Sequence, residues 1–198
     1  MLLKIVQTGH PVLRMEGRNL TKKEIQSAEV QQLIELMRET MRDAPGVGLA
    51  APQVGLSMKL TVIEDDPGAL EDAPEDMKKA QERKGVPFHV LINPKIEAVD
   101  ATPVTHFEGC LSLPGFSALV PRAKKVRVEA LDHKGQPVTI EASGWYARIL
   151  QHEIDHLYGR LYIDRMHTRS FTTNENAGRF LEELSVPELM EKLGIDER

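Results

Sequence analysis

Gln151-His152-Glu153-Ile154-Asp155-His156 is the stretch that decides the fold, because it carries the pattern H-E-x-x-H. Two histidines four residues apart lie on one face of a helix, so both imidazoles can reach one metal ion. Glu153 follows His152 by one residue, which turns its side chain roughly 100° around the helix axis. It can therefore stand beside the metal and handle protons without binding the ion. The stretch predicts a metal site on a helix over residues 144–158.

A surface helix with two solvated histidines is the alternative, since only three of the five positions in the pattern are fixed. Two features count against it. The run 147–150 before His152 looks buried, and core residues occupy the rest of the same helix, namely Trp145, Ile149, Leu150 and Leu157.

Cys110 is the only cysteine of the chain and lies in the segment 108–112, Glu-Gly-Cys-Leu-Ser. A lone cysteine is usually a small buried hydrophobe. Beside H-E-x-x-H, however, it completes a set of one thiolate and two imidazoles, which leaves a fourth position for water, as in catalytic zinc-type sites. His106 as a fourth ligand would close the site and leave Glu153 without a role.

Two peptidase patterns compete with this interpretation. Gly159 occupies the glycine position of the metzincin pattern, but Tyr162 stands where the third ligand should be. Glu175, which follows His156 by 19 residues, stands where many H-E-x-x-H peptidases place a glutamate ligand. A peptidase that uses Glu175 is the first rival function. A non-catalytic, metal-stabilised binding module is the second, and there Glu153 would be dispensable.

The loop 46–51 matches G-x-G-x-x-A, a dinucleotide-binding pattern, in the wrong context. It follows a predicted helix, no strand enters it, and Pro52 prevents a normal helix start. We expect the glycines to let a backbone or a ligand approach closely. Gln53 then offers an amide donor near the site.

Composition excludes several classes of protein. The chain has 198 residues, 41% of them hydrophobic and 28% charged, and its net charge is −5 without a dense Lys/Arg block. We therefore expect no DNA partner. No stretch approaches the roughly 20 apolar residues of a membrane span, so we expect no membrane partner. A lone thiol and the lack of a signal peptide favour a cytoplasmic location, or an organelle matrix if a targeting segment has been removed.

Periodicity and turn residues predict the remaining elements. Residues 1–6 resemble a short strand, and Thr21 and Glu24 form a capping box that starts a helix ending at Pro45. Two C-terminal helices are expected, at 175–184 and from Ser185 onward. Strands are expected at 59–63, 86–93, 95–99, 126–131 and 137–142, and residues 64–85 look like an acidic surface insertion.

Three segments together resemble the peptide deformylase family in identity, order and approximate spacing: 46–53, 108–112 and 151–156. The resemblance covers about residues 1–168, and segments 144–150 and 161–166 look most like a subgroup that contains organellar members. It implies an α+β fold in which antiparallel β-sheets wrap around the central metal-binding H-E-x-x-H helix. The expected organisation is a catalytic domain over 1–168, with the 64–85 insertion, and a C-terminal helical tail over 169–198.

The resemblance also implies residue roles. Metal ligands would be Cys110, His152 and His156, and Glu153 would be the general acid/base. Gln53 and the backbone N–H of Leu111 would stabilise an oxyanion, and Glu108 and Arg122 would form a structural ion pair near the site. We expect the substrate to be bound by Val47, Gly48, Gly109, Trp145 and Ile149.

The implied reaction removes the formyl group from the N-terminal formyl-methionine of new polypeptides and releases formate. Fe²⁺ would be the native metal, whereas Zn²⁺, Ni²⁺ or Co²⁺ would also suit the ligands. N-formylmethionyl nascent peptides are the expected partners, the ribosome is a weaker expectation, and the oligomeric state is left open. Neither the insertion nor the tail touches the motifs, so we expect both to affect assembly and partners and not the chemistry.

Overall fold

The structure is a computed structural model that describes residues 1–68, 75–181 and 184–196. Part of the expected insertion, 69–74, lies outside the described residues, as do 182–183 in the expected helix 175–184, and 197–198. Within the described ranges, no helix is long and apolar enough to span a membrane.

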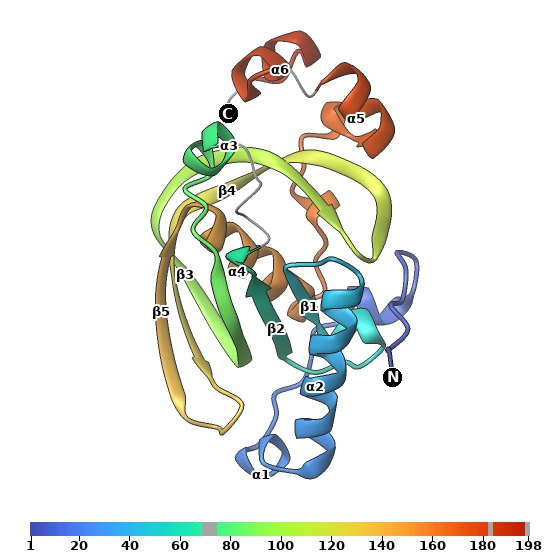
Figure 1. Cartoon of the computed structure of the whole chain (residues 1–198), viewed down its shortest axis with the longest axis vertical. Coiled ribbons are helices and arrows are strands. Elements are labelled where there is room, and N and C mark those ends of the chain that lie inside the picture. Colours follow the sequence, from blue (N-terminus) through green and yellow to red (C-terminus); the bar gives the residue numbers. More distant parts are fainter. Residues whose placement is uncertain (69–74, 182–183, 197–198) are drawn as a thin grey trace.

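An antiparallel sheet surrounds one helix, α4 (Gly144–Leu157), which carries the H-E-x-x-H stretch (Figure 1). The strand order is β1-β2-β3-β4-β5, and β6 pairs with β4. The strands are β1 (Gly48–Ala50), β2 (Leu60–Asp65), β3 (Val86–Cys110), β4 (Leu113–Leu131), β5 (Pro137–Ser143) and β6 (Thr172–Thr173). The α+β class with antiparallel strands around this helix is thereby confirmed.

The long hairpin of β3 and β4 gives the sheet its curvature. Its register shifts between Ile92 and Lys95 and again between Ala98 and Pro103. Such bulges bend a strand and increase its twist, and they accommodate proline, which cannot donate to the ladder. The strands expected at 86–93 and 95–99 are therefore one strand that continues past Pro94 and Pro103 to Cys110. The expectation of a break at Pro94 was wrong.

The N-terminal third also differs from expectation. The capping box at Thr21 forms, but it starts only the short α1 (Lys22–Ile25). Ser27 then accepts a hydrogen bond from the N–H of Val30 at 3.3 Å and starts a second helix, α2 (Ala28–Asp43). Residues 1–6 form no strand. Instead the N–H of Val6 donates to the carbonyl of Gln53 at 2.9 Å, which ties this segment to the glycine loop.

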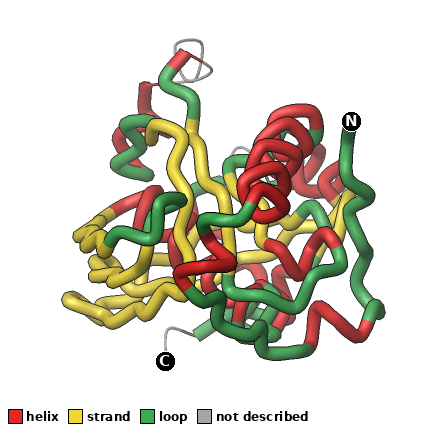
Figure 2. The backbone as a smooth tube through the Cα atoms, turned by 90° about the horizontal axis from the view of Figure 1, so that it is seen from below, coloured by secondary structure: helices red, strands yellow, loops and turns green. Residues whose placement is uncertain are grey.

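Two apolar clusters hold these layers together. The amphipathic α2 lies on the outside of the strands (Figure 2), and its apolar face, including Met37 and Met41, packs on β1, β2 and β3. The apolar face of α4, including Leu150 and Ile154, packs against β2, β3, β4 and β5. The metal-binding helix is therefore fixed on several sides by the sheet.

The C-terminal tail is docked on the sheet. It contains α5 (Asn174–Phe180) and α6 (Val186–Leu193), and the expected capping box of Ser185 and Glu188 forms at the start of α6. The side chains of Leu189 and Met190 are buried against Leu119 of β4.

The described part of the insertion reaches the start of α4. After α3 (Glu75–Ala80), the carbonyl of Gln81 accepts a hydrogen bond from the N–H of Trp145 at 2.8 Å. Gly144 has φ +60°, and an added Cβ would lie only 2.8 Å from the same carbonyl, so this close contact requires glycine. The described part of the insertion therefore contacts the helix that carries the motif, at Trp145, which lies outside the motif itself.

A buried ion pair holds this segment in place. Arg83 donates to both carboxylate oxygens of Asp65 at 2.8 and 2.9 Å, and only 4% of the Asp65 side chain is exposed. The guanidinium of Arg83 also lies 5.2 Å from the ring centroid of Trp145. The adjacent Glu64 pairs with Arg42, which is 54% exposed.

We predict that Asp65→Ala lowers the free energy of unfolding by about 3–5 kcal/mol, because it leaves Arg83 without its carboxylate in a largely buried position. Glu64→Ala, the matched control at the next position of β2, should cost far less, because its partner is solvated. Urea unfolding of both variants makes the comparison. Equal losses would show that the Asp65–Arg83 pair does not anchor the insertion.

Candidate metal centre and active site

Three potential ligand atoms converge where the end of β3 meets α4. Cys110 is the last residue of β3, and His152 and His156 follow one another by one turn of α4. The ligand atoms of the three residues lie within 4.8 Å of one another, and the Cys110 Sγ is 3.4 Å from the His156 Nε2. These three residues form a group that could hold one metal ion.

The donor set fits a divalent transition metal. One thiolate with two imidazoles is a known set for catalytic zinc-type sites, and it leaves a fourth position for water or substrate. Burial alone would raise the pKa of the Cys110 thiol, but His156 and His152 outweigh burial and hold that pKa well below its usual value. The thiolate is therefore favoured, and this is the form that binds metals.

Glu108 orients His152. The two lie 2.9 Å apart, between a carboxylate oxygen and the ring Nδ1, so Nδ1 carries the proton and donates it. This leaves Nε2 for the metal, and a ligating histidine almost always has such a partner. Burial alone would lower the pKa of His152, but Cys110 and Glu108 raise it well above its usual value.

Two arginines neutralise the buried Glu108. Arg122 donates to both carboxylate oxygens at 2.9 Å, and Arg148 donates to one of them at 2.6 Å. Burial alone would raise the pKa of Glu108, but the hydrogen bonds from Arg122 and His152 hold it far below its usual range. Asp155, which accepts from Arg122 and from Arg165, extends the network.

Arg148 and Asp155 were missed by sequence reasoning, although a signal for Arg148 existed. It lies within the run 147–150 that looks buried, and a fully buried arginine is rare unless it is paired. Arg148 also precedes His152 by four residues and therefore lies on the same face of α4. The run could therefore have indicated an acidic partner near the metal ligands.

Glu153 lies in a buried position against the glycine loop. Its carboxylate is 3.4 Å from the hydroxyl of Thr61. A Cβ added at Gly48 would lie 2.3 Å from its Oε1, so the glycine is needed for the approach of this side chain. Burial raises the pKa of Glu153 above its usual value. A carboxylate with a raised pKa is suited to take and return protons near neutral pH.

Gln53 faces the cysteine. Its side-chain oxygen Oε1 accepts a hydrogen bond from the N–H of Ala50 at 2.8 Å, which fixes the orientation of the side-chain amide. The NH₂ group then lies 3.5 Å from the Cys110 sulfur and 3.4 Å from the Ser112 hydroxyl. The glycine loop follows α2, as expected, and itself forms the strand β1 and a 3-10 turn over Ala51–Val54.

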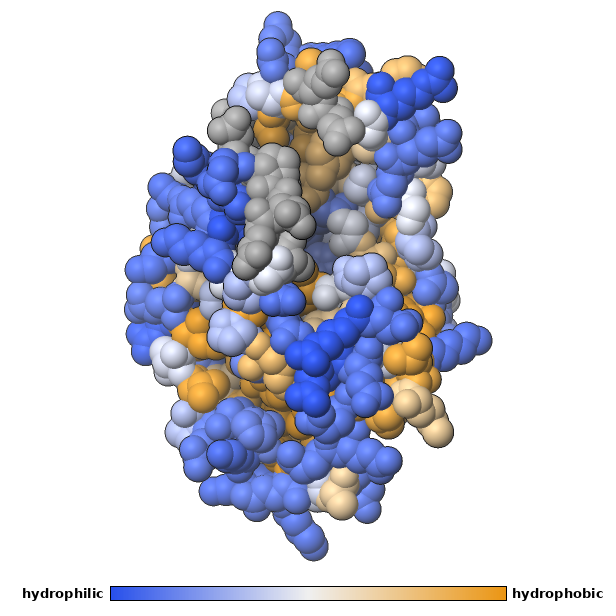
Figure 3. Space-filling view, viewed as in Figure 1, coloured by the Kyte–Doolittle hydropathy of each residue, from blue (hydrophilic) through white to orange (hydrophobic). Residues whose placement is uncertain are grey.

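A cavity of about 470 Å³ opens over these residues. This volume lies in the range of small-molecule sites, roughly 300–1,000 Å³. Figure 3 shows a hollow in this face of the molecule, below α5 and α6. The cavity brings together most of the predicted site residues: Val47, Gly48, Gln53, Glu108, Gly109, Cys110, Leu111, Trp145, Ile149, His152 and Glu153. His156 and Arg122 lie behind its wall.

Other residues that the sequence singled out lie elsewhere. Glu175 is exposed on α5 and is not part of the three-residue metal group. His106 contacts the ring of Trp145, with centroids 6.3 Å apart, and does not join the group. Asn174, the neighbour of Glu175, does line the cavity. The tail therefore reaches the cavity that the motif residues line.

The fold and the site together define a class of protein. It is an α+β protein in which an H-E-x-x-H helix and a cysteine-bearing strand form a potential metal centre. The model of the polypeptide deformylase family matches residues 2–171. The chain belongs to this family.

Known relatives cover most of the chain. It is 48% identical to peptide deformylase 1A, chloroplastic, of Solanum lycopersicum over 87% of this chain, and 46% identical to peptide deformylase 3 of Streptomyces avermitilis, also over 87%. It spans 62% of the tomato protein and 75% of the bacterial one. The Met-Ala-Ser-bound crystal structure of class I type b peptide deformylase from Acinetobacter baumannii aligns with a TM-score of 0.73 at 33% identity, covering 84% of this chain and 99% of that one.

We predict that Cys110→Ala loses tight metal binding, because a thiolate ligand is removed from a set of three. Glu175→Ala should keep a full complement of metal. Metal analysis of both purified variants after dialysis tests this expectation. If only the Glu175 variant lost its metal, Glu175 would be a metal ligand in place of Cys110, as in the peptidase alternative.

Proposed function

We propose that this protein is a metal-dependent amide hydrolase that removes the formyl group from N-terminal formyl-methionine and releases formate. The observation that carries the proposal is the buried Glu153 beside the convergent Cys110, His152 and His156. Membership of the polypeptide deformylase family, and relatives named peptide deformylase, support the same activity.

Each residue has a separate role in the proposed reaction. Cys110, His152 and His156 would hold one divalent ion, which when bound supplies a Lewis acid and lowers the pKa of a water molecule to roughly 7. Glu153 would take a proton from the attacking water and return it to the leaving amine nitrogen. The Gln53 NH₂ group and the backbone N–H of Leu111 would donate to the oxyanion that develops on the formyl oxygen.

The cavity wall would bind the peptide as an additional strand. β1 is at the edge of the sheet and pairs only with β2 among the described strands, so its other edge can accept an extended chain. Val47, Gly48 and Gly109 would contact the substrate backbone, and Trp145 and Ile149 would line the space for the methionine side chain. The related Acinetobacter baumannii structure with bound Met-Ala-Ser supports peptide binding in this fold.

The metal, the compartment and the partners complete the proposal. Fe²⁺ would be the native ion, and Zn²⁺, Ni²⁺ or Co²⁺ would replace it, because one thiolate and two imidazoles suit all four. The substrates would be nascent chains, with the ribosome as a weaker expected partner. The location would be the cytoplasm, or an organelle matrix by analogy with the tomato relative named chloroplastic. Residues 1–168 would form the catalytic domain.

We predict that Glu153→Ala retains its metal but releases formate from a formyl-Met peptide at least ~10²-fold more slowly, the lower end for a lost general acid/base. Gly48→Ala should also slow the reaction, because its methyl group would displace the Glu153 carboxylate from its position. Metal content and steady-state rates of both variants test this. Near-normal turnover by the Glu153 variant would favour a binding module that does not need this residue.

We predict that Gln53→Ala lowers kcat by ~10²–10³-fold, as expected when one oxyanion donor is removed. The measurement is the formate-release rate at saturating peptide concentration. A change confined to KM would instead assign Gln53 to ground-state binding of the substrate.

A further inference from the structure

The C-terminal tail builds part of the cavity wall. Asn174, the first residue of α5, lines the same cavity as the metal group. The strand before it, β6, pairs with Phe116 and Ser117 of β4 just beyond the hairpin tip. The rings of Phe116 and Phe171 are stacked with centroids 5.1 Å apart and an interplanar angle of 7°. Phe116 and Asn174 therefore lie at one lip of the cavity, and Phe171 is stacked on Phe116 next to this lip.

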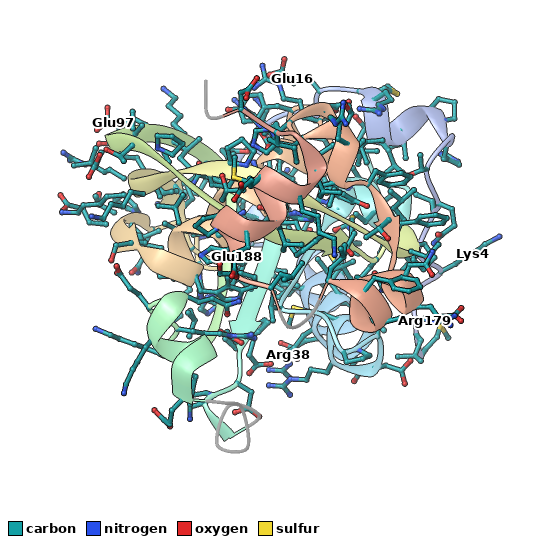
Figure 4. The ribbon with its side chains drawn as sticks, turned by 90° about the horizontal axis from the view of Figure 1, so that it is seen from above. Lys4, Glu16, Arg38, Glu97, Arg179 and Glu188 are labelled. Atoms are coloured by element: carbon teal, nitrogen blue, oxygen red, sulfur yellow. The ribbon has the colours of Figure 1, made fainter. Side chains whose placement is uncertain are left out.

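This lip is firmly anchored. The Ser170 hydroxyl accepts a hydrogen bond from the N–H of Leu119 at 2.8 Å. The side chains of Leu189 and Met190 of α6 are 2% and 5% exposed, because they pack on Leu119. Seen from above, α5 and α6, marked by Arg179 and Glu188, lie across this end of the molecule (Figure 4). The lip is part of the packed structure and can hold a contact with a ligand.

The cavity has a buried inner end and an exposed outer end. Gln53 and Glu153 at the inner end are buried. Phe116 is 37% exposed and Phe171 is 42% exposed, and Asn174 is also exposed. A polypeptide whose formyl group reaches the inner end must leave through the outer one, because its chain continues. The lip with Phe116 and Asn174 forms part of this outer end, so the residues that follow the methionine can reach it.

Asn174 has the chemistry to bind a passing backbone. Among the described residues, its side-chain amide has no hydrogen-bond partner. The amide offers both donors and an acceptor, and an extended peptide presents N–H and C=O groups at every 3.3–3.4 Å of its length. The neighbouring Phe116–Phe171 stack adds apolar surface that a substrate side chain can cover.

We propose that Phe116, Phe171 and Asn174 form a binding site for the second and third residues of a formyl-Met peptide, so that the tail makes the enzyme prefer longer peptides. This inference rests on the proposed deformylase function. Asn174 hydrogen-bonds the substrate backbone, and the aromatic stack favours an apolar side chain at the third position. Asn174 is a specificity-determining residue here and takes no part in the chemistry.

The test compares formyl-Met-Ala with formyl-Met-Ala-Ser. In the wild-type enzyme the longer peptide should have the higher kcat/KM. The gain is the ratio of kcat/KM for the longer peptide to kcat/KM for the shorter one. In Asn174→Ala this ratio should fall roughly 2- to 10-fold, the effect of one hydrogen bond. Asn176→Ala, an exposed asparagine on the same helix that does not line the cavity, is the matched control and should keep the full gain. Melting temperatures and metal content show whether each variant is folded and loaded.

A second variant tests the apolar part of the site. Phe171→Ala should reduce the preference for formyl-Met-Ala-Leu over formyl-Met-Ala-Ser. An equal fall in kcat/KM for every peptide, or an unchanged gain in Asn174→Ala, would overturn the proposed site while leaving the deformylase function intact. Failure of the metal-loaded wild-type protein to release formate from any of the three peptides would instead overturn the proposed function.

Discussion

The buried carboxylate of Glu108 is the interaction on which the rest of the site depends. It accepts four hydrogen bonds, two from Arg122, one from Arg148 and one from His152. A buried charge is stable only when it is paired and its acceptor positions are filled, so this carboxylate can occupy one position only. Because the partners come from β4 and α4, Glu108 joins the hairpin to the metal helix.

That constraint also places the cysteine. Glu108 and Cys110 lie two residues apart at the end of β3, and each contacts a histidine of α4. Glu108 lies 2.9 Å from His152, and the Cys110 sulfur lies 3.4 Å from His156. On the helix, Arg148, His152 and His156 follow at intervals of four residues and form one stripe. The end of β3 and this stripe of α4 thus lie side by side and bring the charged and the metal-binding groups together.

Local features could be predicted from the sequence, whereas long-range ones could not. The capping boxes at Thr21 and Ser185 and the helix around His152 depend on neighbours within a few residues. The continuation of β3 past Pro94 depends on a bulge whose flanking residues, Lys95 and Ile92, pair with residues of β4 that lie 34 and 39 positions further along the chain. The contacts of Gln81 with Trp145 and of Asn174 with the cavity likewise arise from packing between distant segments, and no local pattern marks them. Arg148 is the exception, because a charge inside a buried run is itself a signal.

The two ends of the cavity are held by different forces, and this difference separates their functions. At the inner end, the carboxylates of Glu108 and Glu153 are buried and closely surrounded. Hydrogen bonds are strong in such a low-dielectric environment, so even a small displacement of either carboxylate weakens strong interactions. At the outer end, the lip is held by the apolar contacts of Leu189 and Met190 and by a two-residue strand. Such contacts depend on area and tolerate changes in shape. A change in the shape of the lip is therefore expected to leave the ion network beneath it, and with it the arrangement of Cys110, His152 and Glu153, unchanged.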